Sequence, residues 1–180
     1  MGIVCLEQKL EYFTTEWQEE DLAELLDENR QYLSGANWSE MGCYKTTTGL
    51  WYAERYAKKN NIENPRVLII TTKSGKGTYR DAIPKALPPT WKTYNLSTKQ
   101  VSVIHPFGLE EDYDIDFYFQ DLKNPTRPTI TLAHYHCFVN KAPIWQMLKL
   151  IEWDVIICDE AHRMKNRTTQ WTRNIKVLSK

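Results

Sequence analysis

The sequence predicts an α/β fold in which a mostly parallel sheet is flanked by helices. Two short runs, 67–71 and 153–158, are dominated by apolar residues, which is typical of parallel strands buried on both faces. Segments with helical spacing of apolar residues alternate with these and other strand-like runs. Such alternation indicates strands joined by helical crossovers, and therefore a parallel sheet covered by helices.

The first elements follow from capping and periodicity. Residues 14–31 are predicted to be helical, because Thr15 and Gln18 have the spacing of a capping box and leucines follow at helical intervals. Residues 32–38 are predicted to form a short strand. Residues 46–59 are predicted to form a second helix with one apolar face.

The remaining elements are delimited by glycine and proline clusters. In chain order we predict a strand at 67–71, a turn at 73–77, a helix at 78–87 closed by Pro88 and Pro89, strands at 91–95 and 100–105, an acidic excursion or hairpin at 110–116, a strand at 129–133, a helix that begins at Pro143 and carries Ile144, Leu148 and Ile151 on one face, and a buried strand at 153–158.

Composition limits the function only broadly. In the 180 residues, 23 lysines and arginines balance 23 aspartates and glutamates, so any nucleic-acid contact must come from a local patch, and a protein without a nucleic-acid partner fits equally well. The four cysteines form no C-x-x-C pair, which favours a reducing, intracellular setting. No apolar run approaches the ~20 residues of a membrane span. We therefore expect a soluble, cytoplasmic protein.

Two acids follow the last predicted strand. Asp159 and Glu160 come directly after the apolar run that ends at Cys158, and ligands of open α/β sheets bind at this carboxyl edge. Asp159 is a candidate to hold Mg²⁺ against nucleotide phosphates. Glu160 is a candidate to orient and deprotonate water. Four apolar residues followed by Asp-Glu-Ala-His favour this interpretation over an exposed acidic turn.

A candidate phosphate loop lies about a hundred residues upstream. The segment 39–46 reads SEMGCYKT and directly precedes the predicted helix 46–59. Lys45 could reach the β- and γ-phosphates, and Thr46 could bind Mg²⁺. Orphan N–H groups at the helix start favour anions. The match to G-x-x-x-x-G-K-[ST] is imperfect, because Ser39 and Tyr44 occupy the two glycine places.

These segments resemble motifs of superfamily-two helicases of the Swi/Snf type, DEAH-box DNA-dependent ATPases that include phage-type members. Segment 39–46 resembles motif I (DEMGLGKT), and segment 159–166 (DEAHRMKN) resembles motif II. Segment 67–74 is similar to motif Ia and segment 129–135 to motif Ib. The resemblance spans about residues 12–178, and motif II is its most specific part.

The resemblance implies a RecA-like P-loop domain that binds ATP and Mg²⁺ and acts on duplex DNA. It implies roles for further residues, which we group by function. Nucleotide contacts are implied for Gln18, Gly42, Cys43, Tyr44, Lys45, Thr46 and Thr47, catalysis for Lys45 and Glu160, metal binding for Thr46 and Asp159, DNA-backbone contacts for Lys73, Ser74 and Lys76, and coupling between the two sites for His162.

The same resemblance implies that residues 1–180 form one N-terminal lobe that ends before motif III, with a second lobe in cis or in trans. Tyr44 places a bulky side chain where the family has glycine. One alternative is therefore a non-catalytic module that binds nucleotide, DNA or protein. A different P-loop ATPase, such as a nuclease-associated motor subunit, is a further alternative. For His134, His136 and Cys137, a structural role is favoured over zinc binding, because no second ligand pair has metal-site spacing.

Overall fold

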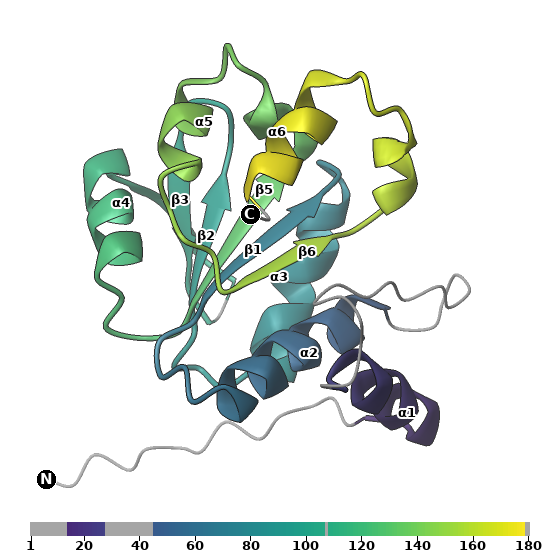
Figure 1. Cartoon of the computed structure of the whole chain (residues 1–180). Coiled ribbons are helices and arrows are strands. Elements are labelled where there is room, and N and C mark those ends of the chain that lie inside the picture. Colours follow the sequence, from purple (N-terminus) through teal and green to yellow (C-terminus); the bar gives the residue numbers. More distant parts are fainter. Residues whose placement is uncertain (1–13, 28–44, 107, 179–180) are drawn as a thin grey trace, which may run out of the picture.

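The computed structural model describes residues 14–27, 45–106 and 108–178. The strands are β1 (Arg66–Thr71), β2 (Lys92–Leu96), β3 (Val101–Ile104), β4 (Glu110–Tyr113), β5 (Thr129–His134) and β6 (Val155–Cys158). They form one sheet in the order β4-β3-β2-β5-β1-β6 (Figure 1). Strands β2, β5, β1 and β6 are parallel, whereas β3 pairs antiparallel with β2, and β4 with β3. The predicted α/β class and mostly parallel sheet are confirmed.

Helices cover both faces of the sheet. They are α1 (Glu16–Leu25), α2 (Lys45–Lys59), α3 (Gly75–Ala86), α4 (Ile115–Lys123), α5 (Pro143–Leu148) and α6 (Gln170–Leu178), with the 3-10 helices η1 (Tyr135–Phe138) and η2 (Ala161–Lys165). The first three pack on one face, and the last three pack on the other (Figure 1). None of the helices in the described ranges is long and apolar enough to cross a membrane.

The two hydrophobic clusters meet at β1. Val67 and Ile69 face the cluster built with α1, α2 and α3. Leu68 and Ile70 face the cluster built with α4, α5 and α6. All four side chains are fully buried, because β1 lies between β5 and β6 and has helices on both sides. The prediction of a strand buried on both faces is confirmed here.

The amino-terminal predictions hold where the structure describes them. Thr15 and Gln18 form the predicted capping box at the start of α1. This helix ends at Leu25, earlier than expected, and residues 28–31 and the strand predicted at 32–38 lie outside the described residues. The helix predicted at 46–59 is α2, which is described from Lys45 onward.

Three boundaries differ from expectation. Helix α3 begins at Gly75, inside the predicted turn, where the Thr72 hydroxyl accepts a hydrogen bond from the Gly75 N–H at 2.9 Å. The acidic segment 110–116 divides into β4, which forms a hairpin with β3, and the start of α4. Helix α5 ends at Leu148, so Ile151 is buried beyond the helix.

The prediction that 153–158 is a fully buried strand is wrong in one respect. Strand β6 begins at Val155 and lies at the edge of the described sheet, where it pairs only with β1. Val155 is buried, but the next three residues are half-buried. An apolar run shows that a segment is suited to burial, but its place in the strand order depends on tertiary pairing.

Candidate nucleotide and metal site

Asp159 lies where the sequence predicts it, at the carboxyl end of β6. Its backbone N–H donates to the Ile70 carbonyl at 2.8 Å, so it continues the pairing of β6 with β1 by one residue. Its carboxylate accepts from the Thr71 hydroxyl at 2.7 Å and from the Glu160 N–H at 3.0 Å. Each carboxylate oxygen therefore has a neutral donor. Among the described residues no lysine or arginine pairs with this carboxylate.

Two residues that hold Asp159 were assigned no role from the sequence. Thr71, the last residue of β1, is fully buried and donates to the carboxylate. The Tyr135 hydroxyl donates to the backbone carbonyl of Asp159. A signal for Thr71 was present, because it is a polar residue at the end of an apolar strand, as Asp159 is. The sequence carries no such signal for Tyr135, because its contact with the Asp159 carbonyl depends on how η1 follows β5.

Glu160 has an unusual backbone conformation. Its φ is 54° and its ψ is 43°, the left-handed region that costs a residue with a Cβ roughly 1–2 kcal/mol. Its side chain is exposed, and its Oε2 lies 3.0 Å from Nδ1 of His162. The two predicted residues, catalytic Glu160 and coupling His162, are thus neighbours at the surface beside Asp159.

The first turn of α2 points toward this end of the sheet. Gly49, one turn into the helix, lies against Ile157 of β6, since a Cβ on Gly49 would meet the Ile157 side chain at 3.6 Å. In Figure 1 the amino end of α2 lies on the side of the carboxyl end of β6. Lys45 is exposed and Thr46 is half-buried. The predicted loop residues Gly42, Cys43 and Tyr44 lie outside the described residues.

Gln18 and Thr47 lie in the contact between α1 and α2. The Gln18 side chain is 2% exposed. Its Nε2 lies 3.0 Å from the Thr48 hydroxyl and 3.4 Å from that of Thr47, and its Oε1 accepts from the N–H and the hydroxyl of Thr15. All four hydrogen-bonding positions of the amide therefore have partners inside the protein. An adenine contact through this amide would require one of these bonds to open.

The predicted DNA-contact residues lie at the start of α3. Lys73 and Ser74 are exposed. Lys76 points instead toward β2, where its ammonium donates to the Asn95 side chain and to the Leu96 carbonyl at 2.8 Å. Burial lowers the pKa of Lys76 below its usual value. Lys73 and Ser74 are thus accessible to a phosphate backbone, whereas Lys76 already has protein acceptors.

His134 and Cys137 are buried at the carboxyl end of β5, and His136 is exposed. The Cys137 Sγ and the His134 Nδ1 are 3.9 Å apart. Burial lowers the pKa of His134 to about 4, and the nearby positive charge of Lys76 acts in the same direction. This histidine is therefore neutral at pH 7 and packs as part of the core.

No group of three or more His, Cys, Asp or Glu side chains gathers in the described ranges to form a protein-only metal site. This does not conflict with Mg²⁺, which usually keeps several waters and takes one or two carboxylates together with substrate phosphates. Asp159 supplies the hard, anionic oxygen ligands that Mg²⁺ prefers. The donor set fits a metal–nucleotide site.

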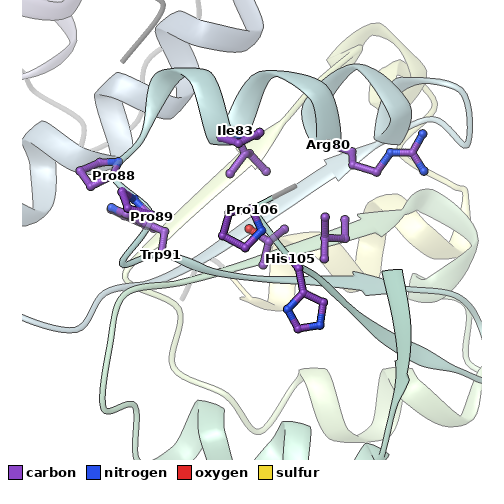
Figure 2. A pocket seen from close by; sticks show the side chains of 10 residues that line it. Arg80, Ile83, Pro88, Pro89, Trp91, His105 and Pro106 are labelled. Atoms are coloured by element: carbon purple, nitrogen blue, oxygen red, sulfur yellow. The ribbon is translucent and has the colours of Figure 1, made fainter. Parts of the chain in front are cut away.

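A pocket lies at the other end of α3, where the helix meets the start of β2 (Figure 2). It is lined by Arg80, Ile83, Pro84, Pro88, Pro89, Trp91, Thr93, Ile104, His105 and Pro106. Of these residues only Arg80 belongs to the group that the resemblance places near the DNA backbone, and none of them was predicted to bind nucleotide or metal. The candidate site at the carboxyl end of β6 and this largely apolar pocket are separate places.

A scan against protein-family models and a search of curated proteins each found no match to the chain.

Proposed function

We propose that the chain is a RecA-like ATP-binding lobe of a DNA-dependent ATPase, a helicase-like translocase of the Swi/Snf type that uses ATP and Mg²⁺ to move on duplex DNA. The observation that carries this proposal is the state of Asp159. Its carboxylate is held by two neutral donors and has no cationic partner among the described residues. It lies at the carboxyl edge of a parallel sheet, where ligands of such folds bind.

Further residues take the roles that the motifs suggest. Lys45 and Thr46 begin the helix whose next turn packs on β6, and they would contact phosphate and metal together with Gly42, Cys43 and Tyr44. Bound Mg²⁺ would neutralise charge on the phosphates. Glu160 would orient and deprotonate water, and His162, 3.0 Å away, would hold its carboxylate. Lys73 and Ser74 would contact the DNA backbone, and a second lobe would complete the cleft.

One observation favours a second candidate, a non-catalytic nucleotide-, DNA- or protein-binding module. The Gln18 amide, which would read adenine, has all its hydrogen-bonding positions filled by Thr15, Thr47 and Thr48. A chain that binds Mg²⁺–nucleotide but gives no DNA-stimulated phosphate release when a second-lobe polypeptide is added would favour this candidate.

Nucleotide binding tests the proposal directly. Calorimetric titration with Mg²⁺–ADP should show binding by the wild-type chain, and both Asp159→Asn and Lys45→Ala should weaken it at an unchanged melting temperature, because both side chains serve the ligand and not the core. Matched controls are Asp116→Asn in α4 and Lys58→Ala in the last turn of α2, which remove the same charges at exposed positions away from Asp159 and Lys45. Equal affinity for the wild type and Asp159→Asn would contradict the proposal.

A further inference from the structure

The carboxyl ends of β1 and β6 are joined by a side-chain hydrogen bond as well as by a backbone hydrogen bond. The Thr71 hydroxyl donates to Oδ2 of Asp159 at 2.7 Å, and the Asp159 N–H donates to the Ile70 carbonyl at 2.8 Å. Thr71 is fully buried. It is the only side chain in the described ranges that donates a hydrogen bond to this carboxylate, since the other donor is the Glu160 N–H. The direction of the Asp159 carboxylate therefore depends on Thr71.

The start of α3 lies directly on the same hydroxyl. A Cβ built on Gly75 would lie 2.2 Å from Oγ1 of Thr71 and 3.4 Å from its Cβ. The Gly75 N–H also donates to the Thr72 hydroxyl, which lies 3.0 Å from the Ser74 hydroxyl. The turn between β1 and α3 is thus packed against the donor that holds Asp159, without room for one additional carbon atom.

We propose that Thr71 is a positioning residue, which orients Asp159 for metal binding and links that carboxylate to the turn at the start of α3. This inference rests on the proposed function, because it assumes that Asp159 holds a metal bound to nucleotide. Lys73 and Ser74, the exposed residues of the turn, lie between Thr71 and Gly75 in the chain. A ligand that displaces this turn would displace the Thr71 hydroxyl, and with it the Asp159 carboxylate.

The test compares three changes at one position. Thr71→Val keeps the shape but removes the hydroxyl, Thr71→Ser keeps the hydroxyl, and Thr71→Ala removes the hydroxyl without demanding space. The measurement is the affinity of the full chain for Mn²⁺ in the presence of ADP, followed by electron paramagnetic resonance of free Mn²⁺. We expect Thr71→Val and Thr71→Ala to bind Mn²⁺ about tenfold or more weakly, as is typical when the group that orients a metal ligand is removed. Thr71→Ser should restore binding.

The link between Thr71 and the start of α3 is tested by alanine substitutions at two glycines in the same helical turn. Gly75→Ala should weaken Mn²⁺ binding in the same direction as Thr71→Val, because the new methyl group displaces the Thr71 hydroxyl. Gly77→Ala is the matched control, since nothing lies within 4 Å of a Cβ at that position. Its Mn²⁺ affinity should equal that of the wild type. Equal affinities for the two alanine variants would overturn the link.

Asp159→Asn separates failure of this inference from failure of the proposed function. If the wild type binds no Mn²⁺ with ADP, or if Asp159→Asn binds as well as the wild type, the proposed function fails and the inference fails with it. If Asp159→Asn loses binding while Thr71→Val and Thr71→Ala keep the wild-type affinity, only the inference is overturned. Melting temperatures of all variants identify any that are unfolded, and Thr71→Ala replaces Thr71→Val if the valine does not fit.

Discussion

Asp159 and Asp121 are both held by several hydrogen bonds, but their surroundings differ in charge. Asp121, in α4, accepts at one oxygen from the Lys92 ammonium at 2.6 Å, from the Tyr113 hydroxyl at 2.9 Å and from the Tyr94 hydroxyl. The ammonium also lies 4.5 Å from the centroid of the Tyr113 ring. Within residues 14–27, 45–106 and 108–178, Asp159 has hydrogen bonds only from neutral donors, the Thr71 hydroxyl and the Glu160 N–H.

This difference separates a structural carboxylate from one suited to a ligand. Burial acts to raise the pKa of Asp121, but the hydrogen bonds from Lys92, Tyr94 and Tyr113 outweigh it and hold the pKa below its usual value. The charge of Asp121 is therefore already balanced by a cation that belongs to the fold. At Asp159 the neutral donors fix the carboxylate, and no cation of the described part of the chain balances its charge, so a metal ion could balance it.

The largest expected effect comes from removing Asp121. In Asp121→Ala the Lys92 ammonium and two tyrosine hydroxyls lose their shared acceptor, and we expect the free energy of unfolding to fall by about 2–3 kcal/mol, less than for a fully buried pair because the group is partly exposed to water. Urea denaturation measures the change. Mg²⁺–ADP affinity should not change, because α4 lies away from the carboxyl end of β6.

Asp159→Asn should show the reverse pattern. It should lose affinity for Mg²⁺–ADP, whereas its free energy of unfolding should change by no more than about 1 kcal/mol, because the amide oxygen can still accept from Thr71. Asp116→Ala, an exposed aspartate of α4, controls for the removal of any surface carboxylate and should change stability by about 0.5 kcal/mol or less. If Asp159→Asn destabilises the chain as much as Asp121→Ala, both carboxylates are structural and the comparison fails.

The neighbourhood of Asp159, which includes His134, and the neighbourhood of Asp121 should also lose stability at different pH values. His134 pairs with Thr71 across β5 and β1, and its pKa in the folded chain is about 4, whereas an unfolded histidine has a pKa near ~6.5. Below pH ~6.5 the unfolded chain binds a proton that folded His134 does not take up. The free energy of unfolding should therefore fall between pH ~6.5 and 4, by about 1–2 kcal/mol once screening by water is allowed for.

The stabilisation from Asp121 is lost only at lower pH. Its pKa is lowered by folding, so this contribution is complete above the unfolded value of ~3.9 and disappears as the pH falls below it. Urea denaturation at a series of pH values should show that His134→Gln flattens the dependence between pH ~6.5 and 4. His136→Gln, at an exposed position two residues away, should retain the wild-type dependence. An unchanged slope in His134→Gln would show that His134 does not set the acid response.

The smallest expected effect concerns the backbone at the site. Glu160 and Asn61 both have a φ of 54°. Asn61 follows the end of α2, and asparagine tolerates this conformation, whereas glutamate does not. Glu160→Gly should therefore raise the free energy of unfolding by about 0.5–1 kcal/mol, and Asn61→Gly should change it less. Thermal denaturation of both variants checks this. No gain for Glu160→Gly would show that the backbone at Glu160 is unstrained.

The predictable parts of the fold have strong local signals. Strand β1 and helix α2 follow from an apolar run and from helical periodicity, and both are confirmed. Helix α4 was missed, although its signal was present. Asp114 caps the helix by accepting from the N–H groups of Asp116 and Phe117, whereas the sequence interpretation assigned residues 110–116 to one excursion or hairpin, of which the hairpin of β3 and β4 is present. In this segment the high acidic content masks the capping residue that starts the helix.

The candidate site was predictable to a different extent at each residue. Asp159 was placed correctly at a strand end, because an apolar run followed by acids locates the carboxyl edge of a parallel sheet. The burial of Gln18 between α1 and α2 could not be predicted, because it depends on how two helices separated in the chain pack together. The direction of Lys76 toward Asn95 likewise depends on the position of β2.

The sequence by itself determined the local elements and the residues at their ends, because hydrophobic periodicity, capping residues and turn residues act over a few positions. Only the tertiary structure decided that β6 lies beside β1 and not elsewhere in the sheet. That pairing brings the Thr71 hydroxyl within 2.7 Å of Asp159 across 88 residues of chain. Strand order is set by the packing of both sheet faces at once, and no local pattern records it.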